Sequence, residues 1–397
     1  MKPGALPLVI FLGLVLSSHA ARAATTISDP SLLADQTWTA AGSPYLLQGD
    51  FTVPSGMTLT LEPGTEIQFA SGDSQAAGED KDRSEFIIDG DLQAPGTAAG
   101  PILFHAQNSA GPLAWAGIVI NATGTATLTH VDIQDANNAV TANGRLLNVA
   151  YSSFTHNVAG IAQGAGNAVL DAVELSNNSG YGLFVLGNAN EASFSLTNAV
   201  LRLNGSYGVY ASSALGQRVT GSIVNCTVHG NISSGIEGQA AGAGSLLTLV
   251  IENTIVSNNG ISGIYADSTG DGTVSVSTSY SDVWSNGANF DGAEAGPHCL
   301  TDDPEYTHAP DDLTLPSTSV CNDAGTPTGM PAHDFSGSPR LASQVDLGAY
   351  AQPVMTVDVK DPALGGCQIG RNGGANWGWL SLCALALVSG RRFTRKP

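Results

Sequence analysis

The sequence is poor in basic and aromatic residues and shows no long amphipathic helical pattern. Lysine and arginine together number 14 of 397 residues, against 34 Asp and Glu, and aromatic residues make up 6%. Residues 24–366 keep all 34 acids and only 7 basic residues, so their net charge is 7 − 34 = −27. Nucleic acid is therefore an unsuitable partner, because its phosphates would be repelled. The missing helical periodicity between residues 50 and 350 favours an all-β domain.

An asparagine recurs at one point of a repeated unit. The gaps between successive members are 157→178 = 21, 178→204 = 26, 204→231 = 27, 231→259 = 28 and 259→286 = 27 residues. Such a period indicates a solenoid, and it is too short for propeller blades. Leucine-rich repeats do not match, since their leucine spacing is missing. The six members are Asn157, Asn178, Asn204, Asn231, Asn259 and Asn286.

Indexing each unit on its asparagine predicts which side chains point inward. Three positions before the asparagine every residue is apolar, and a seventh unit joins if Ala136 takes the asparagine's place: Ile133, Phe154, Leu175, Leu201, Val228, Val256 and Val283. The pattern predicts short strand, corner, short strand, asparagine turn, short strand and variable loop. Units this short must stack on their neighbours to bury apolar side chains. Stacked asparagine amides would then bond to one another along the axis. Asn198, Asn225 and Asn253, six positions earlier, predict a second amide stack.

Both ends of the chain are typical of targeting segments. Residues 1–23 combine Lys2, an apolar run and an Ala21-Arg22-Ala23 site, which predicts a cleaved secretory signal peptide. Residues 377–397 are expected to form a short hydrophobic helix with a basic tail, preceded by a linker, 353–376, that carries Cys367. This tail resembles the C-terminal sorting signals of myxobacteria and related Gram-negative bacteria. The resemblance implies an exported protein at the cell surface, in the outer envelope or released, with Cys367 as the processing site; a permanent, short membrane tail is the alternative.

Two further stretches resemble secreted bacterial β-helix proteins. Residues 54–65 (PSGMTLTLEPGT), with Pro101-Ile102-Leu103-Phe104 and Trp115-Ala116-Gly117-Ile118, are similar to the opening of such proteins. Asp303-Pro304, Cys321-Asn322-Asp323-Ala324-Gly325 and residues 345–350 (VDLGAY) are similar to their terminal segment. The resemblance implies a right-handed parallel β-helix of the pectate-lyase-like superfamily. It divides the chain into an N-terminal cap with first coils at 24–126, regular repeats at 127–292 and a C-terminal capping segment at 293–352.

The cysteines and acidic residues allow two additional predictions. Cys299 and Cys321 flank a loop in an exported protein, so we expect a disulfide between them that staples the segment closing the solenoid. Cys226 lies at an inward position and is expected to be a small buried hydrophobe. Glu79 to Asp91 and Asp291 to Asp312 are rich in acids but lack the ligand spacing of known calcium loops. Calcium remains the one cofactor that the sequence leaves open, and no metal ligand is assigned.

The best catalytic candidates lie on outward positions of neighbouring units. Arg202 and His229 occupy the same position, two before the asparagine, and Glu174 lies four before it in the preceding unit. Together they could bind or deprotonate an acidic sugar; the alternative is a set of solvated surface residues. Trp284 shares their position and is a candidate for sugar stacking. Other tyrosines could stack on sugars or simply pack: Tyr151, Tyr181, Tyr207, Tyr210 and Tyr265.

The fold by itself does not choose a function, because this superfamily contains lyases, hydrolases and many non-catalytic surface proteins. The three-aspartate pattern of polygalacturonases is missing from the repeats, which argues against a hydrolase. We therefore expect a non-catalytic platform for polysaccharide or another cell-surface component. The alternatives are a calcium-dependent lyase acting on acidic glycans and a purely structural or adhesive surface module.

Overall fold

The computed structural model describes residues 23–108 and 111–352, and these form three parallel β-sheets around one core. Sheet A consists of β1 (Thr25–Ile27), β3 (Tyr45–Leu47), β6 (Glu66–Phe69), β9 (Ile102–Ala106), β12 (Val131–Ile133), β15 (Ser153–Thr155), β18 (Glu174–Ser176), β21 (Val200–Arg202), β24 (Thr227–His229), β27 (Ile255–Ser257) and β30 (Asp282–Trp284). Sheet B consists of β4 (Phe51–Val53), β7 (Glu85–Ile88), β10 (Gly117–Ile120), β13 (Asn138–Ala142), β16 (Ala159–Gln163), β19 (Tyr181–Gly187), β22 (Val209–Ala214), β25 (Ile236–Ala241), β28 (Ser262–Thr269) and β31 (Ala288–Asp291). Sheet C consists of β2 (Gln36–Trp38), β5 (Thr58–Leu61), β8 (Asp91–Pro95), β11 (Thr125–Thr129), β14 (Leu146–Ala150), β17 (Gly166–Asp171), β20 (Ala192–Thr197), β23 (Arg218–Val224), β26 (Leu246–Glu252) and β29 (Thr273–Ser279).

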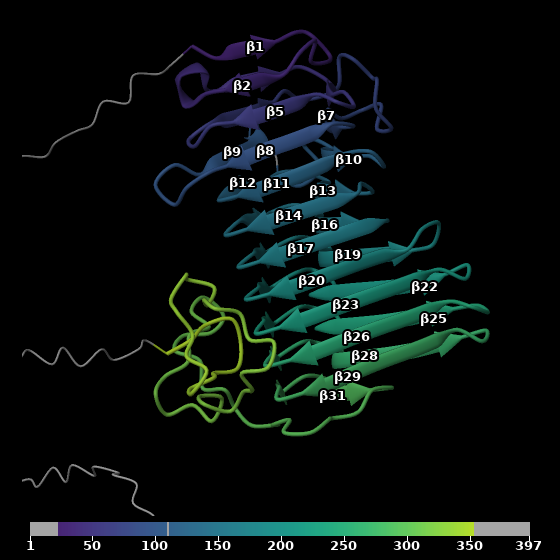
Figure 1. Ribbon diagram of the computed structural model, residues 1–397, viewed down its shortest axis with the longest axis vertical. Coiled ribbons are helices and arrows are strands. Elements are labelled where there is room, and N and C mark those ends of the chain that lie inside the picture. The colour runs from purple at the N-terminus through teal and green to yellow at the C-terminus, as the bar shows by residue number, and fades with distance from the viewer. Residues whose placement is uncertain (1–22, 109–110, 353–397) are drawn as a thin grey trace, which may run out of the picture. The chain divides into compact units, whose positions relative to one another are not determined.

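The chain passes through sheets A, B and C in turn and then starts the next coil, so each strand pairs with strands of the coils before and after it (Figure 1). This is a parallel β-helix, and the predicted fold is confirmed. One 3₁₀ helix, η1 (Ala40–Gly42), interrupts the first coil. The sheets continue through the predicted boundary at 126/127, because β11 pairs with both β8 and β14. No helix in the described part of the chain is long and apolar enough to span a membrane.

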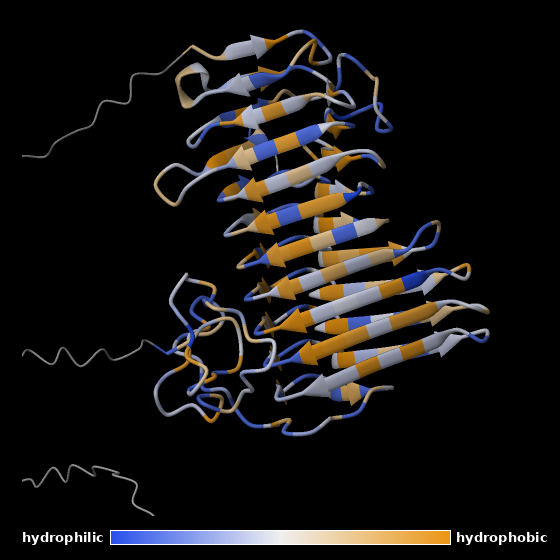
Figure 2. Cartoon of the chain, in the orientation of Figure 1, coloured by the Kyte–Doolittle hydropathy of each residue, from blue (hydrophilic) through white to orange (hydrophobic). Residues whose placement is uncertain are grey.

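The predicted inward column fills the centre of the coils. Ile133, Phe154, Leu175, Leu201, Val228, Val256 and Val283 pair in register across sheet A, and each is 0% exposed. Figure 2 shows apolar and polar residues alternating along the strands, as expected when one side of each sheet faces the core. Cys226 also lies inside, completely buried, as predicted. In the first coils aromatic rings fill the core instead, with Phe69 stacked on Trp115.

The asparagines form a continuous hydrogen-bonded ladder. The side-chain amide of each donates to the side-chain oxygen of the next, at 3.3 Å for Asn157 to Asn178, 3.0 Å for Asn178 to Asn204 and 2.9 Å for the next three pairs. The same oxygen also accepts from the preceding asparagine's backbone N–H. Ala136 extends the ladder through its backbone N–H to Asn157, so buried turn groups find partners in every unit.

The left-handed residue of each asparagine turn lies one position before the ladder. Leu203 (φ 54°), Asn258 (φ 56°) and Ser285 (φ 54°) occupy it, so the ladder asparagines recur for their amides rather than for turn conformation. The second predicted stack lies at the corner between sheets C and A, where Asn198, Asn225 and Asn253 also have positive φ. Asn253 donates to Asn225 at 3.3 Å, but Asn198 binds other groups, so this stack is partial.

Glycine is required directly after the ladder turn. A Cβ on Gly208 would lie 2.6 Å from the carbonyl oxygen of Gly235 and 3.0 Å from the amide nitrogen of Asn231. Any larger residue would push against the backbone and the ladder of the next coil. The asparagine ladder and this close approach therefore depend on each other.

The C-terminal region closes the solenoid only in part. Leu300 donates to Ser281 and accepts from Val283, so the chain covers one edge of the last coil there. The C-terminal segment, residues 301–352, then lies on the outer face of sheet A (Figure 1). Leu315, Cys321 and Leu347 pack against Ile255 of β27, and Leu313 and Ala349 pack against Val200 of β21. The predicted signal peptide, the sorting residue Cys367 and the terminal helix lie outside the described residues, apart from residues 23 and 24 at the cleavage site.

Candidate functional site

The structure brings the predicted catalytic candidates together on sheet A. Arg202 and His229 are partners on neighbouring strands. Arg202 donates to the Oε1 of Glu174 from Nη2 at 3.0 Å and from Nε at 3.2 Å. Trp284 lies two coils beyond His229 in the same column and is partly buried. The indexing on the asparagines therefore placed these side chains on the correct strip of the sheet.

This strip is covered by the C-terminal segment rather than open to a ligand. Arg202 donates to the carbonyl of Pro310 at 2.7 Å, and the ring of His229 meets that of Tyr306 edge-on with centroids 5.3 Å apart. His229 is 5% exposed, and its Nδ1 lies 3.0 Å from the hydroxyl of Ser257. Burial, with a smaller effect of Arg202, lowers the pKa of His229 to about 4. The sequence pattern predicts an exposed strip and does not show this cover, because the covering residues come later in the chain, by 310 − 202 = 108 and 306 − 229 = 77 positions.

The predicted disulfide between Cys299 and Cys321 is wrong: both are free thiols. Cys321 belongs to the C-terminal segment and is completely buried against sheet A, and its Sγ is 3.5 Å from the Oδ2 of Asp282. Cys299 lies on the stretch that crosses the edge of the last coil and is partly buried. The thiol of Cys321 therefore makes a buried polar contact with the Asp282 carboxyl rather than a disulfide. Burial raises the pKa of the Asp282 carboxyl to about 7, and it also raises the pKa of the Cys321 thiol.

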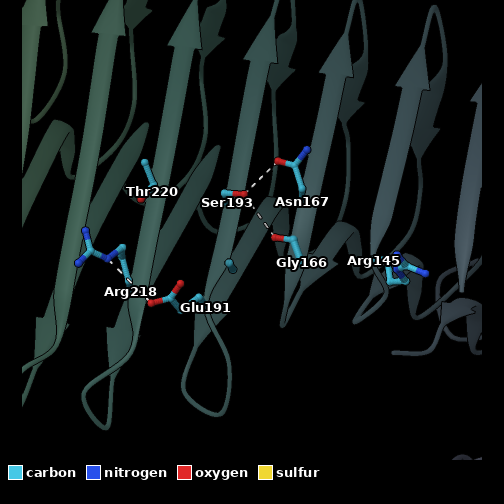
Figure 3. A pocket seen from close by; sticks show the side chains of 8 residues that line it. Arg145, Gly166, Asn167, Glu191, Ser193, Arg218 and Thr220 are labelled. Carbon is cyan, nitrogen blue, oxygen red and sulfur yellow. Dashed lines mark hydrogen bonds and ion pairs between the residues drawn. The ribbon is translucent and has the colours of Figure 1, made fainter. Parts of the chain in front are cut away.

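An open groove lies on the outer face of sheet C (Figure 3). It encloses about 310 Å³ across strands β17, β20 and β23. Asn167, Ser193 and Thr220 form one outward column, since each pairs in register with the next. Ser193 donates to Asn167 at 3.0 Å. We call this site the arginine groove; its lining residues are Arg145, Gly166, Asn167, Glu191, Ala192, Ser193, Arg218 and Thr220.

Two arginines of the groove are the cations that the described fold leaves most available. Arg340 is buried, Arg202 is paired with Glu174, Arg83 is paired with Asp80, and Lys81 donates to backbone carbonyls. These, with the two arginines of the groove, account for every lysine and arginine in residues 23–352. Arg145 and Arg218 are both exposed. The groove therefore concentrates exposed positive charge on an otherwise acidic surface.

The one ion pair in the groove is loose. The Nε of Arg218 lies 3.9 Å from the Oε1 of Glu191, with the two side chains 59% and 73% exposed. Such exposed pairs contribute little and exchange readily with other partners. Arg145 directly precedes β14, and Arg218 is the first residue of β23, three coils farther on, which corresponds to about 14 Å along the axis at ~4.8 Å per coil. The groove can therefore hold two anionic groups of one extended chain, with hydroxyl and amide groups between them.

Indexing on the asparagines could not find this groove. Arg145 stands 157 − 145 = 12 positions before its ladder residue, whereas Arg218 stands 231 − 218 = 13 before its own. Both lie where the chain enters sheet C from sheet B, and the number of residues between this point and the asparagine differs from coil to coil, so a fixed offset misaligns them. The sequence feature that points to this groove is its composition. Arginines are few in this chain, and Arg145 and Arg218 both lie in the variable part of a unit.

No group of three or more His, Cys, Asp or Glu side chains in the described ranges converges as a metal site would require. The acid-rich stretch around Glu85 instead satisfies backbone groups: Asp50 accepts from the N–H groups of Ala77, Gly78 and Glu85. Asp80 pairs with Arg83 at 2.6 Å. The acids near residue 85 are thus used for folding a loop.

No protein family matches the sequence, and no curated protein matches it. Among solved structures, a mutant of the periplasmic alginate epimerase AlgG is similar, with a TM-score of 0.44 and 12% identity over 69% of this chain and 73% of that chain. The structure of AlgG without a stated mutation gives a TM-score of 0.39 and 11% identity over 69% and 73%. Neither likeness assigns an activity or a substrate to this chain.

Proposed function

We propose that the protein is an exported, non-catalytic module that binds acidic polysaccharide in the arginine groove. The observation that carries this proposal is the pair of exposed guanidinium groups, Arg145 and Arg218, flanking a column of hydroxyl and amide groups. Guanidinium groups bind carboxylate and sulfate oxygens through paired hydrogen bonds. Sugar hydroxyls between two such anions would meet Asn167, Ser193 and Thr220. Export is supported by the pattern of residues 1–23.

The acidic surface does not prevent such binding. Charges separated by more than ~8 Å are largely screened at physiological ionic strength, so the guanidinium groups next to the ligand dominate. We expect retention at ~0.15 M salt and its loss near 1 M salt, where the Debye length falls to about 3 Å.

Binding is favoured over cleavage by the residues of the groove. Glu191 is the single carboxylate among the described lining residues, and no histidine, lysine or tyrosine stands beside it. A lyase needs a group that takes the proton beside the uronate, placed within hydrogen-bond reach of it. Glu191 is mostly exposed and its nearest cation is 3.9 Å away, which does not hold it in one position.

The test uses the full-length protein with hexamers of polygalacturonate and alginate, with and without calcium. Binding is measured by calorimetry, and cleavage by the ultraviolet absorbance of unsaturated uronide ends. We expect binding without cleavage, and a loss of about tenfold or more in affinity, equal to about 1.4 kcal/mol, in the R145Q/R218Q variant. R83Q is the matched control, because it removes a cation away from sheet C. Cleavage would instead indicate a lyase. If neither hexamer binds, the proposal is wrong and a purely structural module is favoured.

A further inference from the structure

We propose that the outer face of sheet B carries a second binding site, which takes an uncharged polysaccharide chain against a cluster of four aromatic rings. The ring cluster consists of Tyr181, Phe184, Tyr207 and Tyr210, from two successive coils. This site is on a different sheet from the arginine groove and does not rest on the function proposed above.

The four rings form two stacked pairs. Tyr181 and Tyr207 have centroids 5.6 Å apart and planes 12° apart. Phe184 and Tyr210 have centroids 5.4 Å apart and planes 17° apart. The pairs contact each other, with Tyr181 4.6 Å from Phe184 and Tyr207 5.3 Å from Tyr210. All four rings are partly exposed, so the cluster is a fixed apolar feature on an accessible sheet face.

The cluster ends abruptly on its N-terminal side. The register places Ala159 beside Tyr181 and Ala162 beside Phe184 in the preceding coil. The rings therefore project beyond short side chains, which forms a step on the surface. A pyranose ring has an apolar face of C–H groups that can pack on an aromatic ring, while its hydroxyls remain in water. A step of this kind suits a sugar chain better than a flat sheet would.

Polar groups hold the other side of the cluster in place. The Tyr210 hydroxyl donates to Gln239 at 3.0 Å, and Gln239 donates to Glu237 at 2.8 Å. Glu237 also accepts from Ser234 at 3.1 Å and is 7% exposed. Rings fixed in this way lose little conformational entropy when a ligand binds. The network thus prepares the cluster for a rigid ligand.

The charges around the cluster select against acidic chains. One outward column, in register across sheet B, contains Tyr210, Glu237, Tyr265 and Asp291. In the neighbouring column Asp267 lies beside Gln239, one coil farther on. Asp267 and Asp291 are exposed. The carboxylate of Glu237, one coil (~4.8 Å) from Tyr210, would repel an acidic chain on the rings, and Asp267 and Asp291 lie farther along the sheet. Glu237 is already satisfied by its two donors, so the rings, rather than an ion pair, provide the main contact and the favoured chain is uncharged.

The test titrates full-length protein with uncharged hexamers derived from cellulose, mannan and chitin, and with a glucosamine hexamer and a polygalacturonate hexamer for comparison. We expect at least one uncharged hexamer to bind and the Y181L/Y207L variant to bind it about tenfold or more weakly. Y207F keeps the ring and should bind like the unsubstituted protein. Y151L removes a partly buried tyrosine at the corner between sheets C and A and serves as the control. Melting temperatures establish that each variant is folded.

Several results would overturn the proposal. These are no binding of any uncharged hexamer, binding of the glucosamine hexamer alone, or unchanged affinity in a folded Y181L/Y207L variant. If the ring variant is instead too unstable, Y207L alone provides the same comparison with Y207F. The R145Q/R218Q variant separates the two sites: it should leave the uncharged hexamer's affinity unchanged, whether or not the arginine groove binds acidic chains.

Discussion

Arg340 donates two hydrogen bonds to the side-chain oxygen of Asn198, at 3.3 Å from Nε and 3.2 Å from Nη2, across 142 residues of sequence. Its Nη2 also donates to the carbonyls of Gly348 and Ala349. The arginine is 6% exposed, so these bonds are made away from water. One side chain therefore joins the corner of a coil to two parts of the C-terminal segment.

Replacing Arg340 by methionine should loosen the C-terminal segment. The variant leaves buried acceptors without donors, which costs about 3 kcal/mol. Hydrogen exchange should show faster amide exchange in residues 301–352, with little change in the inner strands. R83M, which removes an arginine from a partly buried loop pair away from the C-terminal segment, is the control. Unchanged protection of the segment in R340M would show that the apolar contacts alone hold it.

The asparagine ladder should be sensitive at single positions. Asn204→Ala removes the amide that bonds Asn178 and Asn231 and leaves the carbonyl of Leu175 without that donor. We expect a loss of about 2–4 kcal/mol in the free energy of unfolding, seen as a lower melting temperature. Asn188→Ala, in the exposed loop between β19 and β20, should be close to neutral. Equal melting temperatures for the two variants would contradict a stabilising ladder.

Stability should fall as the pH rises through about 7, because of Asp282. Burial raises its folded pKa to about 7, with smaller contributions from Asp302 and Asp303. The unfolded chain releases this proton near its ordinary pKa of 3.8, so the folded state binds more protons between these values. The contribution is complete below pH ~4 and is lost towards pH 8, by up to about 4 kcal/mol.

Asp282→Asn removes this titration while keeping an acceptor for the N–H of Asp302. Melting temperatures from pH 5 to 9 should therefore fall less steeply in D282N than in the unsubstituted protein, and D282N should be the more stable of the two at pH 8. D271N, at an exposed turn, is the control and should keep the original slope. Parallel curves for D282N and the unsubstituted protein would rule out Asp282 as the source.

The thiols should differ in reactivity in the native protein. Burial raises the pKa of all three thiols, to about 12 for Cys226, but Cys299 is only partly buried, whereas Cys226 and Cys321 are fully buried. Alkylation of the native protein should therefore label Cys299 first. After denaturation without reductant, peptide mass spectrometry should find one label on each of the three. A 299–321 linked peptide would contradict the free thiols.

The coil architecture could be predicted because its determinants are local and repeated. Phe154, Leu175 and Leu201 share one position of the unit, and neighbouring units are in contact, so periodicity alone aligns them. The residue before each ladder asparagine escaped notice, because Leu203 and Ser285 are not residue types that favour positive φ. The stacked neighbours hold them in that conformation.

The placement of the C-terminal segment could not be predicted in the same way. The residues around Arg340 give no sign that it contacts Asn198, and those around Tyr306 give no sign that it contacts His229. These contacts join the irregular C-terminal segment to the repeats, so no shared periodicity aligns them. The repeat pattern correctly predicts that Glu174 and Arg202 lie side by side on sheet A, but it does not predict that the C-terminal segment covers them. For the same reason, the availability of Arg145 and Arg218 became visible only when the partners of the other cations were known.

The strands of sheet A from β12 onward are all three residues long, whereas those of sheets B and C grow to seven or eight residues in the later coils. The extra strand length thus lies in two walls, and the wall covered by the C-terminal segment keeps one strand length from coil to coil. The longer strands give sheets B and C broader outer faces than sheet A in the later coils. Among the described residues, the chain's own C-terminal segment occupies the narrow wall, and the two broad walls are the sides on which a long, extended molecule can lie.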